Sequence, residues 1–151
     1  MAARRAPTLG LIVQYASRAA GLPSRNQLRR WAAAGLTQPA HVTLRIVNRA
    51  EGRRLNRDFR GKDYATNVLT FTYPDQQPLT GDIVLCAPVV RQEAKLNGVE
   101  VEARFAHLVI HGMLHLQGHD HQRSREAGLM ERLETEIVTR LGYADPYAAY
   151  A

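Results

Sequence analysis

One eleven-residue segment, 111–121, constrains this chain most, because it holds four of its six histidines. It reads HGMLHLQGHDH and follows an apolar run with helical spacing. The spacing places His111 and His115 on one helix face, with Cβ atoms roughly 5–6 Å apart. Gly118 suits the turn after the helix, because glycine readily adopts the left-handed conformation. Such a turn can bring His121 back towards the first two histidines.

Three imidazoles around one ion leave a fourth position open for water, which is typical of catalytic zinc sites. The spacing therefore predicts His111, His115 and His121 as ligands of one zinc ion per chain. Imidazole also binds nickel, iron and manganese, so the sequence leaves the metal open among these. The spacing equals that of metzincin proteases, but Gly112 occupies the position of their glutamate general base. This difference argues against peptide hydrolysis by the metzincin route.

Three neighbouring residues have more than one interpretation. His107 lies one turn before the histidine pair, and eight residues of helix rise about 12 Å, too far for all three to share an ion. His107 is therefore expected to support a metal ligand, to bind a phosphate or to lie in the core. His119 could replace His121 as a ligand. Asp120 could orient a ligand imidazole or cap the following helix.

The histidine segment resembles the signature of the YbeY family, bacterial single-strand-specific metallo-endoribonucleases of ribosomal RNA maturation. That signature reads approximately H-G-x-L-H-L-x-G-Y-D-H. The matching positions are His111, Gly112, Leu114, His115, Leu116, Gly118, Asp120 and His121. His119 departs from it, standing where tyrosine is usual.

A second segment, 55–71, resembles the family pattern L-N-x-x-[YF]-R-x-x-D-x-P-T-[DN]-V-L-S-F-P. The matches are Leu55, Asn56, Phe59, Arg60, Asp63, Thr66, Asn67, Val68, Leu69 and Phe71, whereas Ala65 replaces the usual proline. The resemblance implies that Arg60 is the family's functional arginine. A guanidinium can hold a phosphodiester bidentately and stabilise its transition state. The alternative is a structural salt bridge between Arg60 and Asp63.

The span from Arg45 to Lys62 carries seven basic and two acidic residues, a net charge of +5 in a chain whose formal net charge is +6. Such a run is usually a solvated helix face, but this one supplies most of the excess charge. It therefore favours a groove for a polyanion such as RNA. The candidate substrate-binding residues are Arg60, Arg53, Arg57, Lys62 and His107.

Hydrophobic periodicity predicts an α/β domain, α+β-like, with a mixed sheet of roughly four strands packed by about five helices. The metal site is expected at the end of a helix. The expected strands are 8–16, 41–48, 68–71 and 82–86, the last two forming an antiparallel hairpin around a loop at 74–81. The expected helices are 24–35, 49–59, 89–96, 100–117 and 124–141. Leu129, Leu133, Ile137 and Leu141 are expected to form the apolar stripe of the last helix.

Residues 1–151 are expected to form one metallo-endoribonuclease domain, with 1–7 and 144–151 peripheral. The single cysteine, Cys86, excludes an internal disulfide and fits a reducing compartment. No apolar run is long enough to cross a membrane. We therefore expect a cytoplasmic protein with no membrane or disulfide partner.

The resemblance implies a single-strand-specific, zinc-dependent endoribonuclease with Arg60, His111, His115 and His121 as catalytic residues. It further implies 16S ribosomal RNA 3′ end maturation, ribosome quality control and the small ribosomal subunit as partner. The sequence does not identify the general base, or decide between water and the RNA 2′-hydroxyl as the attacking group. Two alternatives are a metallopeptidase-like hydrolase and a non-enzymatic ribosome-assembly factor with a structural metal.

Overall fold

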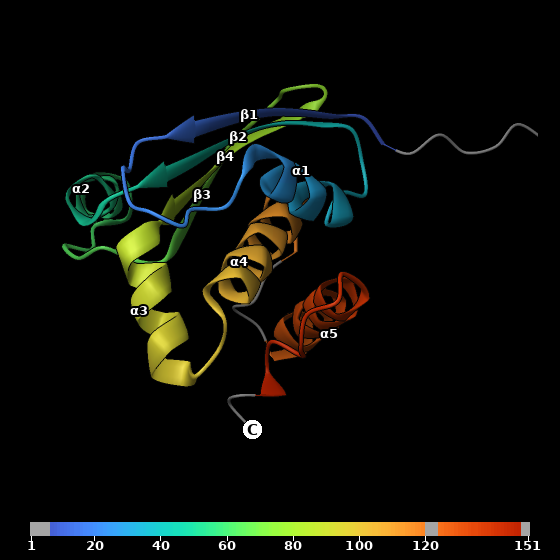
Figure 1. The fold of residues 1–151 in the computed structure, drawn as a ribbon. Helices are drawn as coiled ribbons and strands as arrows, with labels where there is room; N and C mark the ends of the chain where they lie inside the picture. Colours follow the sequence, from blue (N-terminus) through green and yellow to red (C-terminus); the bar gives the residue numbers. More distant parts are fainter. Residues whose placement is uncertain (1–6, 120–123, 149–151) are drawn as a thin grey trace, which may run out of the picture.

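A four-stranded mixed sheet forms one layer of the computed structural model, which describes residues 7–119 and 124–148 (Figure 1). The strands are β1 (Leu9–Tyr15), β2 (Ala40–Val47), β3 (Val68–Tyr73) and β4 (Leu79–Cys86), in the order β1-β2-β4-β3. β2 runs parallel to β1 and β4, and β3 runs antiparallel to β4. The predicted mixed sheet and its antiparallel hairpin are therefore confirmed.

The central strand β4 begins at Leu79, three residues earlier than the sequence predicts. Two residues assigned to the loop, Thr80 and Gly81, pair on both sides; Thr80, for example, lies opposite His41 on β2 and Tyr73 on β3. Turn-forming residues before Leu79 favoured the prediction of a loop there. The pairing of β4 depends on strands that are distant in sequence, so the local pattern did not indicate it. Gly81 suits the crowded centre, because a Cβ there would lie 2.6 Å from a methyl carbon of Leu116.

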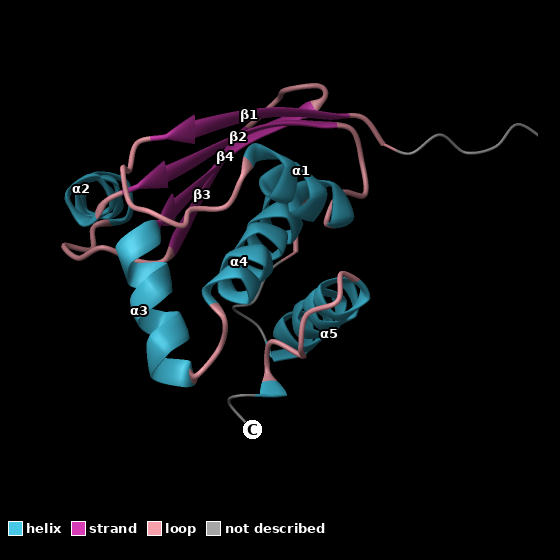
Figure 2. Cartoon of the chain, in the orientation of Figure 1, coloured by secondary structure: helices cyan, strands magenta, loops and turns pink. Residues whose placement is uncertain are grey.

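Most of the helices lie on one side of the sheet, whereas α2 (Arg49–Arg60) packs near the ends of the strands (Figure 2). The structure describes five α-helices: α1 (Arg25–Ala34), α2 (Arg49–Arg60), α3 (Ala87–Asn97), α4 (Val101–Leu116) and α5 (Ser124–Arg140). Ser24 caps α1 through a reciprocal pair of hydrogen bonds with Gln27. None of these described helices is long and apolar enough to cross a membrane.

Two hydrophobic clusters position the site. On one face, Leu44 and Ile83 of the sheet join the buried cluster that includes Trp31 of α1 and Phe105 of α4. On the other face, Leu55 of α2 packs against a smaller cluster that contains Val47, Leu69, Val84 and Cys86. Trp31 and Cys86 are both buried in these clusters.

The helix α4 lies between the sheet and α5 (Figure 1). It is buried around most of its circumference, as expected of a central helix. Gly112 allows it to approach β4, because a Cβ there would lie 3.0 Å from Ile83 Cδ1. The residue at the position of the metzincin glutamate therefore faces the packed side chain of Ile83.

The apolar stripe predicted for α5 is shifted in the structure. Its buried residues are Met130, Glu134 and Val138, whereas Leu129 is 48 % exposed. Leu133, Ile137 and Leu141 pack at the edge of the contact with α4. The prediction is confirmed for Leu133, Ile137 and Leu141, which pack against the core, and is wrong for Leu129. It missed the buried line of Met130, Glu134 and Val138 because it used apolar residues alone, and this line has a carboxylate at its centre.

Candidate metal and phosphate site

The last two turns of α4 place His111 and His115 on one face, with nearly parallel rings 6.4 Å apart at an angle of 20°. Both line a cleft of about 360 Å³, which we call the histidine cleft. Its other lining residues come from α2, the following loop and β3: Asn56, Arg60, Lys62, Tyr64, Thr66, Asn67, Val68, Leu69 and Thr70. The predicted ligand His121 and its neighbour Asp120 lie outside the described residues.

Each described candidate ligand uses its Nδ1 atom in a hydrogen bond. His111 Nδ1 donates to Glu134 Oε1 over 2.5 Å, and His115 Nδ1 donates to the main-chain oxygen of His119 over 3.1 Å. A neutral imidazole with its proton on Nδ1 carries its lone pair on Nε2. Histidines that bind metals commonly donate their other ring nitrogen in this way. The two imidazoles therefore fit a transition metal such as zinc.

His119 contributes to this arrangement through its main chain. Within residues 7–119 and 124–148, no three histidine, cysteine, aspartate or glutamate side chains form a group that could hold a metal. His119 therefore does not complete a three-ligand set with the described histidines. The third ligand stays a prediction, with His121 first and His119 as the alternative, because His121 lies outside the described residues.

The carboxylate of Glu134 is fully buried and accepts hydrogen bonds from three side chains. Its Oε1 accepts from His111, and its Oε2 accepts from His107 Nε2 over 2.9 Å and from the Tyr147 hydroxyl. Burial by itself raises the pKa of Glu134, but the hydrogen bonds from His107, His111 and Tyr147 lower it to about 2. The carboxylate is therefore ionised near neutral pH.

Sequence reasoning missed both Glu134 and Tyr147. Burial and the hydrogen bond to Glu134 raise the pKa of Tyr147, so its hydroxyl remains a donor. Tyr147 also lies edge-on to His107, with ring centroids 5.3 Å apart. It belongs to the segment expected to be peripheral, yet it contacts the residue that supports His111. The only sequence signal for Glu134 was its spacing of four from Met130 and Val138.

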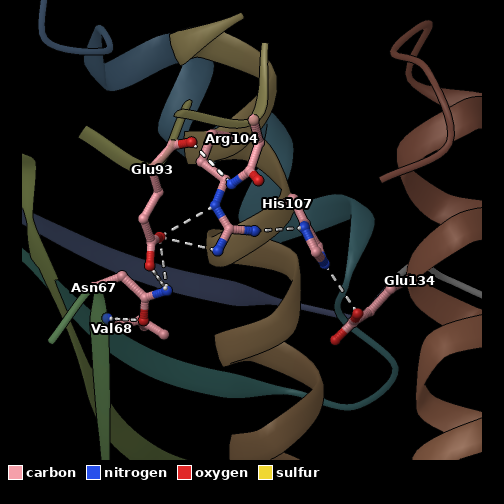
Figure 3. Close-up of polar contacts among 7 residues, drawn as sticks. Asn67, Val68, Glu93, Arg104, His107 and Glu134 are labelled. Atoms are coloured by element: carbon pink, nitrogen blue, oxygen red, sulfur yellow. Dashed lines mark hydrogen bonds and ion pairs between the residues drawn. The ribbon is translucent and has the colours of Figure 1, made fainter. Parts of the chain in front are cut away.

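A chain of polar contacts connects Glu134 to β3 (Figure 3). Arg104 NH1 donates to His107 Nδ1 over 3.1 Å, and its NH2 donates to Glu93 over 3.0 Å. Asn67 also donates to Glu93, and accepts from the main chain of Val68. His107 is 6 % exposed, and both its ring nitrogens are engaged. Both ring nitrogens of His107 thus contact protein groups, and its role in substrate binding stays a prediction.

Arg60 reaches the histidine cleft from the end of α2. Its NH2 donates to the carbonyl oxygen of Thr70 over 2.5 Å, and its guanidinium lies 4.9 Å from the ring centre of Phe71. Asp63, the alternative partner of Arg60, accepts two hydrogen bonds from Arg53 instead, over 2.7 and 2.9 Å. The guanidinium of Arg60 is therefore fixed beside the cleft by β3.

The basic residues predicted to bind substrate divide into two groups. Arg60 and Lys62 line the histidine cleft, where the described lining contains no carboxylate. Arg53 pairs with Asp63, and Arg57 pairs with Asp58, on the exposed side of α2. The cleft thus combines two cationic side chains with two imidazoles, which suits an anionic ligand.

Comparison with known proteins gives one consistent result. A family model described as "Endoribonuclease YbeY" matches residues 24–142. Proteins named endoribonuclease YbeY from Nitrosomonas europaea and Aromatoleum aromaticum are 59% and 57% identical, covering 92% and 93% of this chain and 85% and 93% of their own. The solution structure of Thermotoga maritima TM1509 has a TM-score of 0.53 at 24% identity, covering 86% of this chain and 91% of its own. The TM1509 structure therefore shares the fold of this chain.

Proposed function

The chain belongs to the YbeY family of endoribonucleases, and on this premise we propose that it is a zinc-dependent enzyme that cuts single-stranded RNA during ribosomal RNA processing. One observation carries the proposal. Arg60 and Lys62 share a cleft with His111 and His115, so phosphate-binding and metal-binding side chains line the same space. A phosphodiester bound there contacts both kinds of group.

His111, His115 and His121 are the proposed metal ligands. Their support is the predicted spacing, together with the Nδ1 hydrogen bonds of His111 and His115. When bound, the zinc ion supplies a Lewis acid that polarises phosphoryl oxygens and acidifies water. The imidazoles contribute Nε2 lone pairs of fixed orientation, because Glu134 and the main chain of His119 hold their other nitrogens.

Arg60 is the proposed phosphate-binding and transition-state-stabilising residue. A guanidinium carries five N–H donors, and the contact with Thr70 uses one of its nitrogens. The ring of Phe71 fixes the guanidinium plane from one side. A donor group fixed before reaction needs little reorganisation when negative charge develops on the phosphate. Lys62 adds a second positive charge to the same cleft.

The size of the cleft supports a single-stranded substrate. Its volume of about 360 Å³ suits a small part of a flexible chain, whose bases and phosphates can enter one at a time. A stiff duplex cannot bend its backbone in this way. Ribosomal RNA as substrate, specifically the 3′ end of the 16S molecule, follows from the family resemblance. The small ribosomal subunit as partner, a role in ribosome quality control and a cytoplasmic location complete the proposal.

The test is cleavage of a labelled single-stranded RNA by wild type and His115→Ala, purified side by side, with a duplex and a peptide as comparison substrates. His41→Ala is the matched control, since His41 is exposed on β2 and does not line the cleft. We expect wild type and His41→Ala to cut the single strand, and His115→Ala to fail. Equal cleavage by all three proteins indicates contamination. Peptide cleavage without RNA cleavage supports the metallopeptidase alternative, and zinc binding without any cleavage supports the assembly factor.

A further inference from the structure

The hydrogen-bond chain through α3, α4 and α5 fixes the positions of its protons, starting from Arg104. A guanidinium stays protonated in proteins, so each of its nitrogens can only donate. Arg104 NH1 lies 3.1 Å from His107 Nδ1, which must therefore accept. In a neutral imidazole the proton then lies on the other nitrogen, so His107 carries it on Nε2.

The same reasoning extends to the histidine cleft. His107 Nε2 donates to Glu134 Oε2 over 2.9 Å, as does the Tyr147 hydroxyl. An ionised carboxylate accepts only, so His111 Nδ1 must donate to Glu134 Oε1 across their 2.5 Å contact. This order of donors and acceptors gives His111 the Nδ1–H tautomer, with the lone pair on Nε2.

We infer that Glu134 is a positioning residue that holds His111 in its metal-binding tautomer, and that Arg104 and His107 hold Glu134 in place through their hydrogen bonds. The inference rests on the proposed function, because it takes His111 as a metal ligand. It extends the metal centre from α4 to a side chain of α5. His115 differs from His111, since a main-chain carbonyl rather than a side chain accepts from its Nδ1.

The surroundings of Glu134 argue against a role in packing alone. Its neighbours at a spacing of four on α5 are Met130 and Val138, which contact α4 through apolar side chains. An apolar residue at position 134 would continue that contact. A buried carboxylate loses its hydration instead, so it must be stabilised by hydrogen-bond partners. Glu134 has such partners in His107, His111 and Tyr147, and one of them is the candidate ligand.

The test compares Glu134→Gln with Glu136→Gln, an exposed site on the same helix. Zinc affinity is measured by competition with a chromogenic chelator, and ligand geometry by the visible spectrum of the cobalt-substituted protein. Loss of a residue that orients a metal-binding histidine typically weakens metal binding about 10–100-fold. We expect that loss and altered cobalt bands for Glu134→Gln alone. Circular dichroism of the metal-free proteins checks that both variants fold.

A second measurement uses the wild-type protein, so its result does not depend on whether a variant folds. Two-dimensional proton–nitrogen NMR of the imidazoles reports each tautomer in the metal-free protein. We expect His111 with its proton on Nδ1 and His107 with its proton on Nε2. The opposite tautomer at His111 overturns the inference, as does unchanged zinc affinity in Glu134→Gln, and both results leave the proposed function standing. Wild type that binds neither zinc nor cobalt overturns the metal centre and the inference together.

Discussion

His111 on α4 and Glu134 on α5 are 23 residues apart in sequence, yet the imidazole Nδ1 lies 2.5 Å from the carboxylate Oε1. The contact connects a residue that lines the histidine cleft with a carboxylate that has no exposed surface. It makes the packing of α5 against α4 a condition for the orientation of His111. The site therefore depends on a helix that contributes no residue to the described lining of the cleft.

Replacing Arg60 with lysine should lower kcat by roughly 100-fold, since loss of one fixed transition-state donor has about that effect. Lysine keeps the positive charge but not the planar, bidentate donor group. Steady-state cleavage of a single-stranded RNA gives kcat and KM separately. Arg57→Lys is the control, because Arg57 pairs with Asp58 and does not line the cleft. Equal loss in both variants contradicts a specific role for Arg60.

Removal of the metal with a chelator should abolish RNA cleavage while the helices remain folded. The contact of Ile110 and Leu114 with Met130 and Val138 is apolar and needs no ion. A ligand that binds only the native state stabilises it, so the melting temperature should fall on chelation. Added zinc should restore both turnover and melting temperature. Turnover that survives complete chelation contradicts the prediction, whereas a lower melting temperature with no turnover in any state favours the assembly-factor alternative.

The substitution Gly81→Ala should destabilise the protein by about 1–3 kcal/mol, the usual effect of overpacking a core. Its Cβ would lie 2.6 Å from a methyl carbon of Leu116 and 2.8 Å from the main-chain oxygen of Phe71. Gly128→Ala on α5 is the control, for which the opposite effect on stability is expected. Apart from the adjacent backbone of its own helix, no atom lies within 4 Å of its added Cβ, and alanine favours a helix by about 0.5–1 kcal/mol over glycine. Denaturant unfolding measures both, and a neutral Gly81→Ala contradicts the crowding.

The ion pair of Glu51 with Arg45 should stabilise the protein at neutral pH and lose this effect in acid. The hydrogen bond from Arg45 lowers the pKa of Glu51 below its ordinary value of 4.5, against the opposite effect of burial. A carboxyl group with a lowered native pKa contributes stability above its unfolded pKa. That contribution is lost as the pH falls below about 4.5.

Denaturant unfolding of wild type and Glu51→Gln at pH 7 and pH 3 measures this effect. We expect wild type to be the more stable protein at pH 7, and the difference to shrink at pH 3. The pair is partly exposed, so the difference should be small and should decrease with added salt. A difference that grows in acid contradicts the predicted sign.

The elements that the sequence predicted well depend on short-range geometry. Ser24 begins α1, and Gly61 and Gly98 follow α2 and α3 in the left-handed conformation, because these preferences act within a few residues. The extent of β4 and the buried face of α5 were predicted less well. Both depend on partners far away in the chain, so a local pattern of apolar residues does not contain them.

The sequence by itself determined that His111 and His115 share a helix face, because a helix repeats every 3.6 residues. Only the tertiary structure placed Arg60 beside them, since residues of α2, β3 and α4 line the same histidine cleft. Only the tertiary structure also supplied Glu134, because the burial of α5 on α4 selects which of its side chains face His111. Spacing sets neighbours along one element, whereas packing sets neighbours between elements.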